Sequence, residues 1–250
     1  NIQSNGGTNV SVTGITIDGV RSKDCRGGIQ LISKTATSNT IKNVTVWSTK
    51  AKQLFGFYEQ AFAACNNTVV GLTVVNQANG FQFDNAGGTS TLNAAQVTIS
   101  GCDAGVNRSA SMNLTIKNGV IQSCTAAAGG TGGTMNSSYM VLANTGDGTY
   151  TRGTGDTTGT VTTLSDAPQF APPQGSSLYS GGTTATTAQD KYGSTFGTSA
   201  TWSRNALAAF PIATGGSTTA LTLPSSTTVS NAATLWRDWK DIPSNRPEHL

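Results

Sequence analysis

Two families of short strand-like segments recur along the first half of the chain. In the first family, Ile29, Phe55, Phe81 and Val106 hold equivalent places in GIQLIS, LFGFYEQ, GFQFDN and AGVNRS, at intervals of 26, 26 and 25 residues. In the second family, VTGITI, IKNVTV, VVGLTV, AAQVTI and IKNGVI begin at residues 12, 41, 69, 94 and 116. A repeat this short, with two strands per unit and no helical periodicity, predicts a coil that climbs by one strand spacing per turn.

Two other repeat architectures fit this pattern less well. Leucine-rich repeats need a recurrent Leu and Asn frame, and propeller blades need repeats of about 40 residues or more. We therefore expect an all-β chain in which residues 10–124 form about four to five rungs of a parallel β-helix. Equivalent side chains on successive rungs would then lie about 4.8 Å apart.

Alternation within GFQFDN predicts which side chains face outward. Phe81 and Phe83 fall on one face of a strand, and Gln82 and Asp84 fall on the other. If Phe55 is aligned with Phe81, Tyr58 lies beside Asp84 on the next rung. The polar row would also include Gln30 and Asn107.

The repeat is lost after residue 128, so we expect three regions. Residues 1–128 form the β-helix. Residues 129–163 form a Gly/Thr-rich linker and a β-hairpin at MVLANTGDGTYTR, from Met140 to Arg152. Residues 164–250 form a β-rich or loop-rich region with oligomerising potential.

A short helix is predicted near the end of the chain, in SNAATLWRDWKDIP. It begins at Ser230 or Asn231 and stops before Pro243. Trp236 and Trp239 lie on its apolar side and need a large partner surface. That surface belongs either to the same domain or to another subunit, where Trp is enriched.

Composition excludes several classes of function. Charged residues make up 11% of the chain and the net charge is +3, with basic residues scattered rather than clustered, so we expect no nucleic-acid partner. No apolar run approaches the length of a membrane span, so no membrane insertion is expected. The single histidine, His249, argues against His-based catalysis or metal ligation, and we expect neither a metal nor another cofactor.

The four cysteines have no CxxC spacing, which argues against zinc. Cys102 and Cys124 each follow the last apolar residue of a repeat by three positions, after Ile99 and Ile121. They should therefore lie one above the other on adjacent rungs. A buried pair of free thiols is the favoured interpretation, and a disulfide between them stays open.

The ITI, VTV, LTV and VTI series, together with GIQLIS, FGFYEQ and GFQFDN, resembles the right-handed parallel β-helix superfamily, which includes pectate lyases and phage tailspikes. The resemblance covers about the first half of the chain and concerns architecture, because this fold carries many activities. A β-helix followed by a Thr/Gly/Ser-rich β region is most similar to the layout of phage tailspikes. That resemblance implies a virion tail or extracellular protein, a homotrimer, other virion proteins as partners, and bacterial surface polysaccharide as ligand.

Candidate site residues follow from the polar row. We expect the glycan to be bound by five residues: Gln30, Tyr58, Gln82, Asn107 and an outward-pointing Trp47. If the protein also cleaves the glycan, Asp84 and Glu59 are the candidate catalytic carboxylates, provided that the strand ends at Tyr58, since alternation otherwise turns Glu59 the opposite way. Two alternatives remain: a secreted polysaccharide lyase or glycoside hydrolase, and a non-catalytic adhesin or structural spike segment.

Overall fold

The computed structural model describes residues 2–5, 11–84, 90–108, 111–173, 176–179, 181–183, 204–206, 221–222 and 228–229. The chain divides into two units, Asn1–Ala209 and Phe210–Leu250. In the second unit, β16 (Leu221–Thr222) and β17 (Thr228–Val229) pair in antiparallel fashion. The predicted helix with Trp236 and Trp239 lies outside the described residues.

The first unit is built from short and long strands that follow one another closely. The early strands are β1 (Ile2–Asn5), β2 (Ser11–Thr13), β3 (Thr16–Asp18), β4 (Arg21–Lys23), β5 (Gly27–Lys42), β6 (Thr45–Trp47) and β7 (Gln53–Val75). The later strands are β8 (Gln77–Phe83), β9 (Ser90–Ser100), β10 (Ala104–Asn107), β11 (Met112–Gln122), β12 (Ala126–Gly129), β13 (Met135–Ala143), β14 (Gly146–Gly148) and β15 (Thr157–Gly159). A 3-10 turn, η1, spans Ser177–Tyr179.

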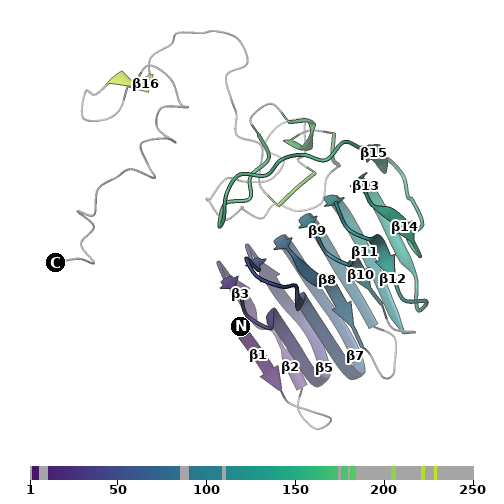
Figure 1. Ribbon diagram of the computed structural model, residues 1–250. Helices are drawn as coiled ribbons and strands as arrows, with labels where there is room; N and C mark the ends of the chain where they lie inside the picture. Colours follow the sequence, from purple (N-terminus) through teal and green to yellow (C-terminus); the bar gives the residue numbers. More distant parts are fainter. Residues whose placement is uncertain are drawn as a thin grey trace, which may run out of the picture. The chain divides into compact units, whose positions relative to one another are not determined.

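These strands form a parallel β-solenoid of about five turns. All 15 strands belong to one sheet, in which β8, β10, β12 and β14 follow one another on one side of β7, and β9, β11, β13 and β15 follow on the other. Figure 1 shows the strands stacked side by side in the order of the chain, from purple to teal. The expectation of an all-β parallel solenoid is therefore confirmed.

One corner of each turn is made by a residue in the left-handed conformation. Lys42, Val70, Ala95, Lys117 and Ser138 pair in sequence across five turns. Each is followed by a residue with positive φ, namely Asn43, Gly71, Gln96, Asn118 and Tyr139, with φ between 54° and 71°. Because Gly and Asn adopt this conformation at little cost, three of the five positions suit the bend. Because this corner recurs at the same position of each turn, the strands of successive turns stay in register.

A column of glycines allows the two walls of the solenoid to approach closely. A Cβ added to Gly28, Gly56, Gly80 or Gly105 would overlap Val46, Val74, Ile99 or Ile121, respectively, on the opposite wall. Each glycine directly precedes a fully buried residue of the core, in the column Ile29, Phe57, Phe81 and Val106. The absence of a side chain is therefore a packing requirement at these positions.

The register corrects two parts of the predicted alignment. Phe57, and not Phe55, stacks between Ile29 and Phe81. Ile17, and not Val12, stacks under Ile41. The rest of the second family is aligned as predicted, since Ile41, Val69, Ala94 and Ile116 pair in turn.

The predicted hairpin from Met140 to Arg152 is wrong. β13 pairs in parallel with β11, and β14 pairs in parallel with β12. The Gly-Asp-Gly segment therefore belongs to a further turn of the solenoid, in which long-range pairing overrides a local turn signal. β12 lies in the segment TAAAGG and continues the wall that contains β8 and β10.

After β15 the chain returns along the outside of the solenoid. Residues 160–171, here called the strap, contact two distant turns: Gln122 exchanges two hydrogen bonds with the backbone of Thr162, at 2.8 and 3.0 Å, and Phe170 packs edge-on against Trp47. Farther on, Leu178 packs against Val120 and Val141. One outer face is therefore covered by the chain itself (Figure 1).

Asp156 closes the last turn through four hydrogen bonds to its carboxylate. Its Oδ1 accepts from the Met140 backbone N–H at 2.8 Å. Its Oδ2 accepts from the Ser137 hydroxyl at 2.6 Å, the Gly153 N–H at 2.8 Å and the Tyr150 hydroxyl at 2.9 Å. The terminal turn of a solenoid has no following turn to satisfy its polar groups, so this carboxylate serves as a cap.

Asp156→Ala should destabilise the protein by at least about 2 kcal/mol, because it leaves several donors without an acceptor. Chemical denaturation measures the loss. Asp147→Ala is the matched control, since Asp147 pairs with Arg152 at 2.8 Å in an exposed position and such pairs contribute little. Equal effects of the two substitutions would contradict the capping role.

Candidate functional site

Four polar residues form one row on the outside of the solenoid wall that contains β8. The register places Gln30 beside Tyr58, Tyr58 beside Gln82, and Gln82 beside Asn107. Successive members therefore lie one strand spacing apart, about 4.8 Å. The structure brings together the four residues that the repeat predicts, although Tyr58 is level with Gln82 and not with Asp84.

A surface pocket of about 310 Å³ lies on this row. Its polar lining residues are Arg26, Gln30, Tyr58, Gln82 and Asp84, and its apolar lining residues are Leu54 and Phe55. We call it the Tyr58 pocket. Asn107 belongs to the row but not to the pocket lining. The row thus extends beyond the pocket by one turn.

The polar side chains of the pocket are joined by hydrogen bonds. Asn79 Nδ2 donates to Gln82 Oε1 at 3.1 Å, and Gln82 Nε2 donates to Asp84 Oδ2 at 3.0 Å. The Tyr58 hydroxyl lies near the Asp84 carboxylate. The Asp84 backbone N–H donates to the Glu59 carbonyl at 3.0 Å, which fixes the end of β8. Asp84 is therefore held by groups on two turns.

Tyr58 stays protonated at neutral pH. Burial, together with the neighbouring Asp84 charge and hydrogen bond, raises the pKa of the Tyr58 hydroxyl to about 12. A phenol with such a pKa is a hydrogen-bond donor and a poor base. Asp84 is the only carboxylate among the described residues that line the pocket.

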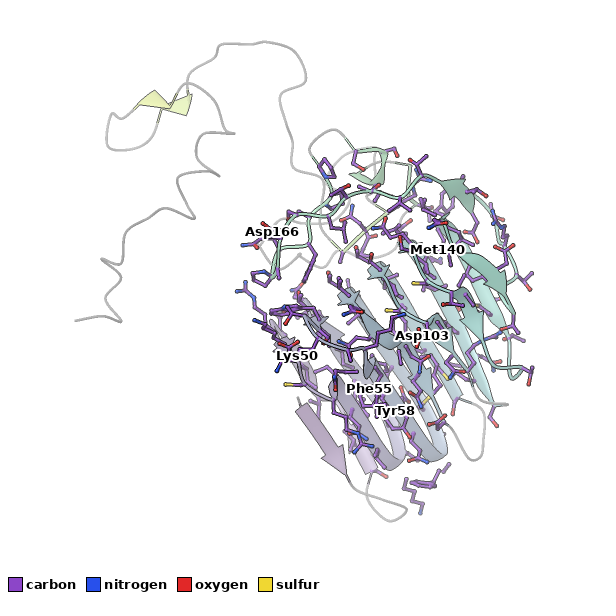
Figure 2. All side chains as sticks on the ribbon, in the orientation of Figure 1. Lys50, Phe55, Tyr58, Asp103, Met140 and Asp166 are labelled. Atoms are coloured by element: carbon purple, nitrogen blue, oxygen red, sulfur yellow. The ribbon has the colours of Figure 1, made fainter. Side chains whose placement is uncertain are left out.

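Phe55 and Tyr58, which are 5% and 9% exposed, form an aromatic pair that lines the pocket. Their rings are stacked, with centroids 5.0 Å apart and an angle of 27° between the planes. Figure 2 shows the two labelled side chains close together on the solenoid. The Phe55 ring lies against Gly27, where an added Cβ would overlap it. Leu54, which is 42% exposed, adds an apolar rim.

Three pocket residues were not predicted from the sequence: Arg26, Leu54 and Phe55. The repeat predicts that Phe55 lies in the core column, because the segment FGF offers two phenylalanines two residues apart. The signal that distinguishes them is the glycine before each core residue, which selects Phe57. Arg26 lies just before the strand and carries no periodic signal.

Glu59 does not pair with Asp84 in a catalytic site. Glu59 is fully buried inside the solenoid, between Leu31 and Phe83 in its column, whereas Asp84 is exposed on the outside. The strand continues past Tyr58, so alternation turns Glu59 inward. The predicted carboxylate pair is therefore wrong.

Buried amides stabilise Glu59 within the core. Asn67 Nδ2 donates to Glu59 Oε1 at 3.1 Å, and the Cys65 thiol lies within hydrogen-bonding reach of the carboxyl group. Asn67 Oδ1 in turn accepts from Asn39 Nδ2 at 2.9 Å, on the preceding turn. Burial raises the pKa of Glu59 to about 7, since the charged form is poorly solvated there.

The predicted exposure of Trp47 is also wrong. Trp47 is 9% exposed, because Phe170 of the strap packs on it with ring centroids 5.9 Å apart. The strap comes from a distant part of the sequence, so alternation alone cannot reveal this cover.

No group of three or more His, Cys, Asp or Glu side chains in the described part of the chain could hold a metal ion. Within the same residues, no helix has the length and apolar character needed to cross a membrane.

Comparisons with protein-family models, curated proteins and solved structures find no match to this chain. The assignment of a function therefore depends on the geometry of the row and the pocket.

The raised pKa of Glu59 predicts a pH-dependent stability. The neutral carboxyl group is favoured in the folded state, so its contribution is fully present below the unfolded pKa of about 4.5 and is lost as pH rises to about 7. Glu59→Gln should remove this loss and become more stable than the wild type above pH 7, by up to about 3 kcal/mol.

The measurement is denaturant unfolding of both proteins between pH 4.5 and 8. Asp103→Asn is a suitable control, because Asp103 lies in an exposed pair with Lys52. A constant difference between wild type and Glu59→Gln over this range would contradict the buried, neutral state of Glu59.

Proposed function

We propose that this protein binds an extended bacterial surface polysaccharide along the row of Gln30, Tyr58, Gln82 and Asn107. The observation that carries the proposal is the Tyr58 pocket, whose lining joins a stacked pair of aromatic rings with two amides, a carboxylate and a guanidinium. Apolar surfaces with a few convergent polar groups are typical of small-molecule and sugar sites.

The linear form of the row supports a polymer as ligand. Its polar side chains recur at each turn, and the wall on which they lie differs from the face covered by the strap. A chain of sugars lying across several turns would make a series of weak contacts. Such contacts add up when they belong to one molecule.

We also propose that this protein is part of a phage tailspike or a similar virion receptor-binding protein. It is supported by the resemblance of a parallel β-solenoid followed by a Thr/Gly/Ser-rich region to tailspike layout. That layout implies a homotrimer that contacts other virion proteins. Native mass spectrometry should then give three times the chain mass of 25.5 kDa, and a monomer would favour the secreted alternative.

The pocket chemistry favours binding over hydrolysis by paired carboxylates. Glycosidases commonly use two carboxyl groups about 5 to 9 Å apart, and Asp84 is the only one among the described lining residues. A depolymerase is the competing proposal. It predicts new reducing ends or unsaturated sugars from the bound polysaccharide, and loss of that release in Asp84→Asn.

Tyr58→Ala should lower affinity for the recognised polysaccharide at least tenfold, and Gln82→Ala by about two- to tenfold. Tyr58 supplies an aromatic ring and a hydroxyl group to the pocket lining, whereas Gln82 supplies hydrogen bonds only. Calorimetric titration of purified capsular and O-antigen polysaccharides measures both.

Asn93→Ala is the matched control, since Asn93 is an exposed amide in β9, on another wall of the solenoid. It should leave affinity unchanged. If no polysaccharide in a broad panel binds, or if Asn93→Ala weakens binding as much as Gln82→Ala, the proposed site is incorrect.

A further inference from the structure

Cys102 and Cys124 occupy the same position on neighbouring turns. Ser100 pairs with Gln122, and the Gly101 N–H donates to the Gln122 carbonyl at 3.0 Å. Cys102 and Cys124 each lie two residues after that pair, 22 residues apart in sequence. The prediction of a stacked pair of free, buried thiols is confirmed.

The spacing of the two turns suits a disulfide. Strands of a sheet lie about 4.8 Å apart, and disulfides join Cα atoms about 4.4 to 6.8 Å apart. The two thiols interact at this corner. Each also donates to a backbone carbonyl of its own turn, Cys102 to Ser100 at 3.7 Å and Cys124 to Gln122 at 3.3 Å. The Thr125 N–H donates to the Cys102 carbonyl at 3.1 Å, so the backbone at this corner is also tied across the two turns.

The two thiols are not equivalent. The neighbouring Cys102 thiol, with further support from backbone N–H groups and the Lys52 ammonium, lowers the pKa of Cys124. The neighbouring Cys124 thiol and burial raise the pKa of Cys102. Cys124 is 5% exposed and Cys102 is fully buried. Cys124 is therefore the more accessible and the more nucleophilic of the two.

Charged groups lie next to the pair on the surface. Lys52 Nζ forms an ion pair with Asp103 Oδ1 at 2.5 Å, directly beside Cys102 in the chain. Lys52 and Asp103 belong to different turns, so this pair holds the Lys52 ammonium near both sulfur atoms. Figure 2 labels Asp103, which marks the position of this corner on the solenoid.

The other two cysteines differ from this pair. Cys65 is buried beside the Glu59 carboxyl group, pairs with Ala36 and Ser90 in its ladder, and has a pKa raised by burial. Cys25 is partly exposed near the start of the solenoid, where its thiol donates to the Lys23 carbonyl at 3.3 Å. Neither has a cysteine at the equivalent position of the next turn.

We propose that Cys102 and Cys124 are a redox-active pair that small disulfide oxidants convert to a disulfide between two turns of the solenoid. The Cys124 thiolate attacks one sulfur of the oxidant, which forms a mixed disulfide and releases one thiolate. Cys102 then loses its proton to solvent and attacks the Cys124 sulfur, which releases the second thiolate. Two protein thiols are oxidised and one small disulfide is reduced to two thiols.

The new bond would join the turn that begins with β10 to the turn that begins with β12. This constraint should raise the melting temperature by roughly 5 to 10 °C, as expected for a cross-link that closes a loop of this length. The oxidising conditions outside cells favour such a bond.

The test uses the full chain, first reduced and then exposed to oxidised glutathione. Alkylation under denaturing conditions, followed by peptide mapping, should show Cys102 joined to Cys124 while Cys65 remains alkylated and the partly exposed Cys25 is alkylated or carries glutathione. The linked Cys102 and Cys124 peptides should together lack two hydrogens, and the melting temperature of the protein should rise.

Two single variants test the order of attack. Cys102→Ser should retain a glutathione adduct on Cys124, because no second thiol is present to displace it. Cys124→Ser should leave Cys102 unmodified, because the buried thiol does not reach the oxidant. Cys65→Ser serves as the control and should oxidise at the 102–124 pair as the wild type does.

Recovery of Cys102 and Cys124 as free thiols after prolonged oxidation of the wild type would overturn the proposal, and so would pairing of either with Cys25 or Cys65. This readout does not depend on how well the variants fold.

Discussion

Parallel backbone hydrogen bonding between one turn and the next is the constraint on which this structure depends. Because each residue pairs with its equivalent on the following turn, every side chain belongs to a column, and each column has one environment along its length. The column of left-handed corner residues and the column of glycines hold this register at two places around each turn. The apolar core, the row of Gln30, Tyr58, Gln82 and Asn107, and the pair of Cys102 and Cys124 all follow from this register.

The same strand illustrates how one register produces two kinds of chemistry. In β7, Tyr58 faces outward into a row of amides, and Glu59, the next residue, faces inward into a core of Leu31 and Phe83. The outward phenol has its pKa raised by partial burial and a neighbouring carboxylate. The inward carboxyl group has its pKa raised by complete burial. Adjacent residues thus belong to the outer polar row and to the core, respectively.

The sequence predicts this architecture well where one periodic signal has no competitor. The series from Ile41 to Ile116 gives the correct register because only one alignment superimposes its apolar residues. The segment FGF around Gly56 allows two alignments, and only the glycine before each core residue selects Phe57. Burial of Trp47 and capping by Asp156 both depend on contacts with distant segments, which no local period contains.

Cross-linking of neighbouring turns tests the register most directly. In a background with all four native cysteines replaced by serine, Gln30→Cys combined with Tyr58→Cys should form a disulfide readily, because the two positions lie side by side. Ile32→Cys combined with Tyr58→Cys, a pair expected from a 26-residue repeat, should not, because Ile32 lies beside Gln60. Efficient cross-linking of the second pair and failure of the first would contradict the register, and with it the row and the Tyr58 pocket.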